Sequence, residues 1–241
     1  MSYDSGDETG GQIGAWAPGT APYMFSEGLG FYLPKGGDLV IEIHYHLDGK
    51  EHMDQSSVGL YLSKKPLKKQ VQSLFVGSMD VNVPAGQNNY WRHVFMNVSE
   101  DMEIIDATPH MHYIGKEFIM VATLPDGTRK NLLKIDQWDF RYQDVYIFDK
   151  PVKIPKGSRI DCWFSYDNSA ENSANPNSPP KPIKWGWNTD DEMLEVYITI
   201  ITDKVGPLMK DAYNSWLQPA YSKGPLSKKD MAKKLMNGKY R

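Results

Sequence analysis

Residues 117–135 read EFIMVATLPDGTRKNLLKI and decide how the rest of the chain is interpreted. Two short runs with apolar residues, Glu117 to Leu124 and Arg129 to Ile135, flank the tetrapeptide Pro125-Asp126-Gly127-Thr128. Tight turns favour Pro, Asp and Gly, and short apolar runs on both sides of such a turn are typical of a β-hairpin. The stretch therefore predicts two antiparallel strands joined by a tight turn.

Turn-forming residues also separate short apolar runs elsewhere along the chain. Sixteen prolines and twenty glycines fall between short runs that are rich in Val, Ile, Tyr and Phe, which is typical of an antiparallel all-β protein. We predict a jelly-roll-like antiparallel β-sandwich with a short helical C-terminal tail. Outside the hairpin, the clearest predicted strands are Leu39–His46, Val58–Leu62, Ser158–Tyr166 and Glu195–Asp203.

The composition is that of an ordinary globular protein. The chain has 241 residues, 40% of them hydrophobic, and a net charge of -3, so it can form a core and lacks the basic excess that nucleic-acid binding requires. No apolar run is long enough to cross a bilayer, and the first ten residues do not resemble an export signal. The single cysteine, Cys162, excludes an internal disulfide and leaves the compartment open.

Two histidines at alternate positions form the first candidate for chemistry. In an extended backbone His110 and His112 project from the same face, so both imidazoles can reach one metal ion. A pair of polar residues on a solvated strand face would have the same spacing. The pair alone therefore leaves a metal site and a plain surface equally open.

A methionine favours the metal interpretation. Met193 follows the acidic run Asp190-Asp191-Glu192 and directly precedes the strand predicted from Glu195. A methionine in such a place is usually a core residue. A thioether beside two imidazoles, however, is a soft ligand set that favours Cu(I), and three ligands leave a coordination position open for dioxygen.

Two segments resemble a known enzyme family. Residues 110–116, HMHYIGK, resemble the His-X-His-X-X-Gly-Lys segment of peptidylglycine α-hydroxylating and dopamine β-monooxygenases, and residues 191–193, DEM, resemble their Asp-Glu-Met. These enzymes are copper type II, ascorbate-dependent monooxygenases. The resemblance extends from Gly14 to Thr202 and is closest to bacterial members.

The resemblance implies a role for five residues. His110, His112 and Met193 would bind the catalytic copper, and His44, in the segment IEIHY, would bind a second, electron-transferring copper. Tyr197 would contact a small-molecule or peptide-like substrate. Dioxygen would be the co-substrate of a C–H hydroxylation, ascorbate or another reductant would supply electrons, and the full-length protein would be periplasmic or extracellular.

The chain also departs from the family pattern. No adjacent histidines occur anywhere, although the electron-transfer copper of the family needs a His-His pair upstream of the position of His44. Thr108 stands where the family has an arginine, and Glu195 where it has an asparagine. A substrate carboxylate would therefore meet Glu195, and like charges repel. We expect peptidylglycine not to be the substrate.

These matches and departures predict three parts. Residues 1–65 would be the truncated end of a first, electron-transfer copper domain, and residues 66–205 would be the C-terminal catalytic copper domain. Residues 206–241 would be a helical tail. A missing N-terminal copper domain is implied as a partner.

Two other interpretations remain open. The chain could be a copper-binding module without catalysis, which oxygen uptake with ascorbate would distinguish. It could also be a cupin-like iron or manganese oxygenase, because Gly37 followed by His44, His46 and Glu51 approximates a cupin motif, although the spacing does not fit.

Overall fold

The hairpin predicted from residues 117–135 is present. In the computed structural model, which describes residues 13–16, 22, 24–45 and 48–203, strand β6 (Gly115–Thr123) pairs with β7 (Arg129–Ile135). Gly127 has a φ of 84°, a left-handed conformation that glycine adopts without strain. The turn therefore needs its glycine.

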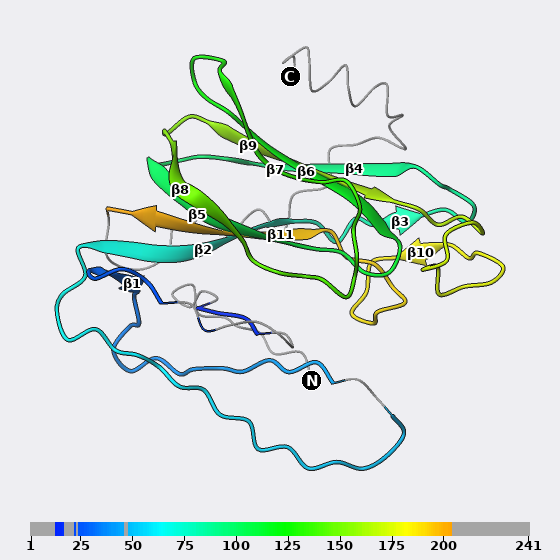
Figure 1. Cartoon of the computed structure of the whole chain (residues 1–241), viewed down its shortest axis with the longest axis horizontal. Coiled ribbons are helices and arrows are strands. Elements are labelled where there is room, and N and C mark those ends of the chain that lie inside the picture. Colours follow the sequence, from blue (N-terminus) through cyan, green and yellow to red (C-terminus); the bar gives the residue numbers. More distant parts are fainter. Residues whose placement is uncertain (1–12, 17–21, 23, 46–47, 204–241) are drawn as a thin grey trace.

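Two sheets stack face to face (Figure 1). The first sheet has the strand order β1-β2-β11-β5-β8 and the second has the order β4-β9-β6-β7. The remaining strands of the first sheet are β1 (Leu29–Phe31), β2 (Lys69–Gly77), β5 (Met102–His110), β8 (Tyr146–Ile154) and β11 (Glu195–Thr202). The second sheet adds β4 (Tyr90–Asn97) and β9 (Arg159–Tyr166), and β3 (Asn82–Val83) pairs with β10 (Ile183–Lys184).

The connections are those of a jelly roll. Apart from β1, all pairings within the two sheets are antiparallel, and β2, β11, β5 and β8 face β4, β9, β6 and β7. Along the chain, each step among these eight strands crosses to the opposite sheet, except the hairpin from β6 to β7. This confirms the predicted all-β jelly-roll sandwich. The tail predicted to be helical, residues 206–241, lies outside the described residues.

The core lies between the sheets and consists of alternate residues of each strand. Val196, Ile198 and Ile200 of β11 are fully buried, as are Phe118 of β6 and Phe164 of β9, whose rings lie 4.9 Å apart. Because strands alternate, the residues between those of β11 point to the outer face of the first sheet. That outer face carries the candidate site.

Two predicted strands are wrong. Residues 39–45 and 58–62, both described, form no strand and belong to an extended arm, residues 32–68, that Figure 1 shows running below the first sheet. Apolar residues at neighbouring positions are exposed there, such as Val40 at 57% and Ile41 at 47%. A strand-forming sequence still needs a partner strand, and neither segment has one among the described residues.

Three of the remaining predictions agree with the structure to within a few residues. β6, β9 and β11 match the runs expected at 117–124, 158–166 and 195–203. Among the described residues, no helix has the length and apolar character needed to cross a bilayer.

Candidate metal centre

His110 and His112 lie together at the end of β5. His110 is the last residue of the strand and is the register partner of Glu195, the first residue of β11. The two imidazole rings are 5.0 Å apart between centroids and nearly perpendicular, at 83°. The alternation expected from the sequence therefore brings both rings to one place.

Hydrogen bonds orient both imidazoles through the same ring nitrogen. Nδ1 of His110 lies 2.5 Å from Oε1 of Gln143, and the Nε2 amide of Gln143 donates to the Phe140 carbonyl at 2.8 Å, which fixes the direction of the amide. Nδ1 of His112 lies 3.3 Å from the Asp191 carbonyl. Because these oxygens only accept, each Nδ1 carries the proton, and Nε2 is the nitrogen left for a ligand.

Both imidazoles are neutral at neutral pH. Burial and, to a smaller extent, the neighbouring His112 lower the pKa of His110 to about 4. Burial also lowers the pKa of His112, although the backbone carbonyls of Asp191 and Asn188 act in the opposite direction. Metal ligation requires the neutral form of histidine, so neither side chain has to lose a proton first.

Met193 precedes β11 by two residues and is tied to His112 by the buried side chain of Glu192. Continuing the register from the pair of His110 and Glu195 places Met193 opposite His112. Oε1 of Glu192 accepts the backbone N–H of His112 and, at 2.8 Å, the backbone N–H of Met193. Met193 is 4% exposed, so its thioether sits in an environment with little water.

The turn after β5 depends on a glycine. A Cβ at Gly115 would lie 2.8 Å from Cβ of Met111 and 2.8 Å from Cδ1 of Trp138. The Trp138 indole in turn donates to the His112 carbonyl at 3.2 Å, and the Phe140 ring is 6.0 Å from the His112 ring. The segment between β7 and β8 therefore packs on the histidine turn, and the missing side chain at Gly115 makes room for it.

Next to the histidines, the outer face of β11 carries a carboxylate and a phenol. Tyr197 donates a 3.4 Å hydrogen bond to Oε2 of Glu195, and its ring contacts Phe75 of β2 at 5.2 Å. Burial and, to a smaller extent, the negative charge of Glu42 raise the pKa of Glu195 to about 7. Burial and Glu195 together raise the pKa of Tyr197. A ligand at this face would meet an acidic group.

The arm brings His44 close to the site. His44 is exposed, its Nε2 lies 2.9 Å from Oε1 of Glu42, and its ring is 6.1 Å from that of Trp187. It is near enough to lower the pKa values of His110 and His112. The structure thus brings His44 toward the pair from a segment 66 positions earlier in the chain than His110.

A purely His, Cys, Asp and Glu site is not found. Within the described ranges, no group of three or more such side chains is arranged to hold a metal ion. His46, which the cupin alternative needs beside His44 and Glu51, lies outside the described residues. The sulfur of Met193 is the candidate for a third donor beside His110 and His112.

Sequence reasoning missed two residues of the site. Gln143 lies in a connection without periodic pattern, and no sequence signal points to its contact with His110. Glu192 appeared in an acidic run and in the Asp-Glu-Met match without a role of its own, whereas the structure buries it completely. The rings of Trp185 and Trp187 also contact each other, with centroids 5.2 Å apart.

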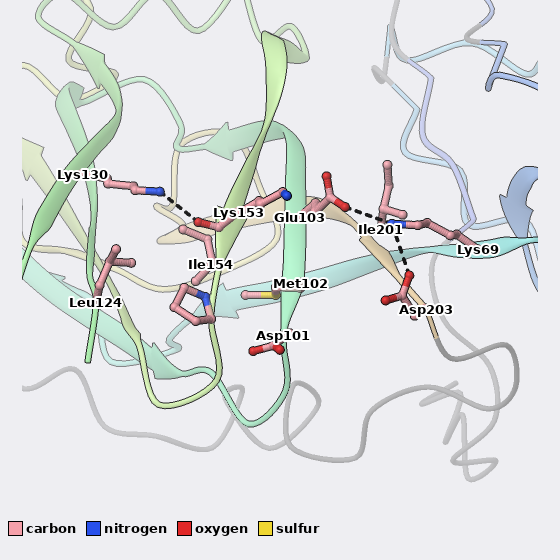
Figure 2. A pocket seen from close by; sticks show the side chains of 11 residues that line it. Lys69, Asp101, Met102, Glu103, Leu124, Lys130, Lys153, Ile154, Ile201 and Asp203 are labelled. Atoms are coloured by element: carbon pink, nitrogen blue, oxygen red, sulfur yellow. Dashed lines mark hydrogen bonds and ion pairs between the residues drawn. The ribbon is translucent and has the colours of Figure 1, made fainter. Parts of the chain in front are cut away.

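A groove of about 370 Å³ lies at the opposite end of the same strands (Figure 2). It is bordered by Met102, where β5 begins, and by Ile201, near the end of β11. Lys69 on its rim is paired with Glu103 at 3.0 Å and with Asp203 at 3.2 Å. The groove is therefore separate from the histidine site, and these charged groups neutralise one another.

Comparison with known proteins gives no family. No protein-family model matches the chain, and no curated protein matches it.

Proposed function

We propose that the chain is a copper-dependent monooxygenase domain that binds copper through His110, His112 and Met193. The observation that carries the proposal is that both imidazoles are held through Nδ1, while the Glu192 side chain ties the backbone of His112 to that of the buried Met193. Copper bound there would supply one-electron redox chemistry and dioxygen activation for C–H hydroxylation, with ascorbate or another reductant as electron donor.

The donor set fits copper better than the harder ions. Two neutral imidazoles and a thioether form a soft set, whereas iron, manganese and magnesium sites usually include carboxylates. Oε1 of Glu192, the buried carboxylate between the two ligand segments, is occupied by backbone N–H groups of His112 and Met193. This arrangement supports copper over a cupin-like metal centre.

The face beside the site indicates which substrates are disfavoured. Glu195 is the register partner of His110, and Glu42 is close enough to raise its pKa. A substrate that presents a carboxylate here would meet the buried Glu195 and the exposed Glu42, and like charges repel. Tyr197, which bonds to Glu195, is the proposed substrate contact, and a peptide carboxylate is not expected to bind.

Oxygen uptake tests the activity. Copper-loaded protein with ascorbate should consume oxygen faster than the same concentration of copper with the His110→Ala variant. The variant keeps the sandwich because His110 is half-buried and lies at the end of β5. Equal background uptake by both proteins, with copper bound to the wild type, would instead favour a copper-binding module without catalysis.

A further inference from the structure

The two strands that carry the proposed ligands separate where the ligands lie. The ladder between β5 and β11 ends at His110 and Glu195, so His112 and Met193 lie one step beyond the last pair of backbone hydrogen bonds. Strands that separate normally leave their ligand side chains free to move apart. Something other than the ladder must hold His112 and Met193 together.

Glu192 occupies that position. Oε1 of its side chain accepts the backbone N–H of His112 and, at 2.8 Å, the backbone N–H of Met193. One carboxylate oxygen thus replaces the missing step of the ladder and joins the two segments. Glu192 is 0% exposed, so water does not compete for these bonds.

The backbone of Glu192 is itself fixed. Its N–H donates to the Lys184 carbonyl at 3.0 Å, and its carbonyl accepts the N–H of Gly186 at 3.3 Å. The carbonyl groups of both ligand residues are also held. The Tyr166 hydroxyl donates to the Met193 carbonyl at 2.8 Å, and the Trp138 indole donates to the His112 carbonyl. Glu192 therefore links the backbones of the two segments, in addition to the contact between Nδ1 of His112 and the Asp191 carbonyl.

We propose that Glu192 is the positioning residue that sets the separation of His112 and Met193, and so decides whether imidazole and thioether can bind the same copper. The inference rests on the proposed function. Glu192 bonds to the backbone N–H groups of the two ligand residues. Its effect is therefore on the positions of their donor side chains. Partners that orient metal ligands typically change metal affinity by about 10- to 100-fold when they are lost.

Two substitutions test whether the position of the accepting oxygen matters, or only the presence of a polar side chain at position 192. Glu192→Gln keeps an accepting oxygen at the same reach, whereas Glu192→Asp keeps the carboxyl group but withdraws the oxygen by one methylene. Thr189→Ala is the matched control, since it shortens an exposed side chain in the same turn. Circular dichroism and thermal melting establish that each variant is folded.

The measurements are Cu(I) affinity, by competition with a chromophoric Cu(I) chelator, and X-ray absorption of the Cu(I)-loaded proteins. We expect Glu192→Asp to bind Cu(I) about 10- to 100-fold more weakly and to lose the copper–sulfur contribution. Glu192→Gln and Thr189→Ala should retain both the affinity and the copper–sulfur contribution of the wild type.

The outcomes distinguish this inference from the proposed function. Wild type that binds Cu(I) with a sulfur ligand, together with a Glu192→Asp variant that is unchanged, overturns the role of Glu192 alone. Wild type without Cu(I) binding overturns both. Should Glu192→Asp fail to fold, Glu192→Gln still decides, because loss of the copper–sulfur contribution while the accepting oxygen is kept overturns the inference.

Discussion

At the scale of single residues, hydrogen-bond acceptors decide which nitrogen each histidine can offer. Gln143 fixes the proton of His110 on Nδ1, and the Asp191 carbonyl does the same for His112. Neither acceptor can donate in the observed orientation, so both rings present Nε2. The two imidazoles are in this sense prepared for a ligand before it arrives.

Gln143→Ala should weaken copper binding. Without the amide, the His110 ring loses the contact that sets its proton and its orientation, and Cu(I) affinity should fall by about tenfold or more. Chelator competition measures the change. Gln137→Ala is the control, because Gln137 is exposed in the same connection between β7 and β8; equal affinity in both variants would contradict the role of Gln143.

Cys162 should be inert in the native protein. It is fully buried in β9, and burial raises the pKa of its thiol, so the reactive thiolate is scarce. A thiol-specific alkylating reagent, followed by mass spectrometry, should leave the native protein unmodified and label it once in denaturant. Rapid labelling of the folded protein would contradict the burial of this residue.

Sequence reasoning reached the candidate ligands but not the residues that hold them. His110, His112 and Met193 have characteristic spacing and chemistry, so they can be predicted from the sequence. Gln143 and Glu192 act through contacts between distant segments, 33 and 80 positions from the histidines they bond. No local sequence pattern indicates a contact between such distant segments.

At the scale of elements, the turn that follows β5 is the least tolerant part of the site. Gly115 lies against Met111 and Trp138, so any side chain there displaces either the turn or the indole that holds the His112 carbonyl. The turn carries His112, so a change in its backbone moves a proposed ligand directly.

Gly115→Ala should lower both thermal stability and copper affinity. A Cβ at 2.8 Å from two neighbours requires a shift, which in a packed region typically costs about 1–3 kcal/mol. Thermal melting and chelator competition check the two effects. Gly59→Ala is the control, since a Cβ there meets nothing within 4 Å; a similar loss in both variants would contradict the packing explanation.

Strand prediction succeeded where a partner strand exists and failed where none does. β6 and β11 are each paired on both sides, and the edge strand β7 is paired with β6. The segment 39–45 is equally rich in strand-forming residues, yet both of its faces are exposed. The composition of a segment indicates its tendency to form a strand, whereas pairing with a neighbouring strand depends on the rest of the molecule.

At the scale of the whole molecule, the sandwich supplies a rigid frame for the site. The ligand segments leave from β5 and β11, adjacent strands of the first sheet, and the turn that carries His112 is packed against the connection from β7 in the second sheet. The arm adds His44 from outside the sandwich. The site therefore depends on both sheets being in place.

Phe164→Ala should destabilise the whole sandwich. The ring is fully buried and packs edge-on against Phe118, so its removal leaves a cavity between the sheets at a cost of about 3–5 kcal/mol. The midpoint of urea unfolding measures the loss. Tyr61→Ala, at an exposed position in the arm, should leave the midpoint unchanged, and equal shifts would contradict the location of the core.

The central claim is that His110, His112 and Met193 form one copper site. Its most direct test is metal analysis of the purified protein after loading with copper under reducing conditions, for the wild type, His110→Ala and Met193→Ala. We expect about one tightly bound copper per chain in the wild type, its loss in His110→Ala and weaker retention in Met193→Ala. Copper retained equally by all three proteins would contradict the claim.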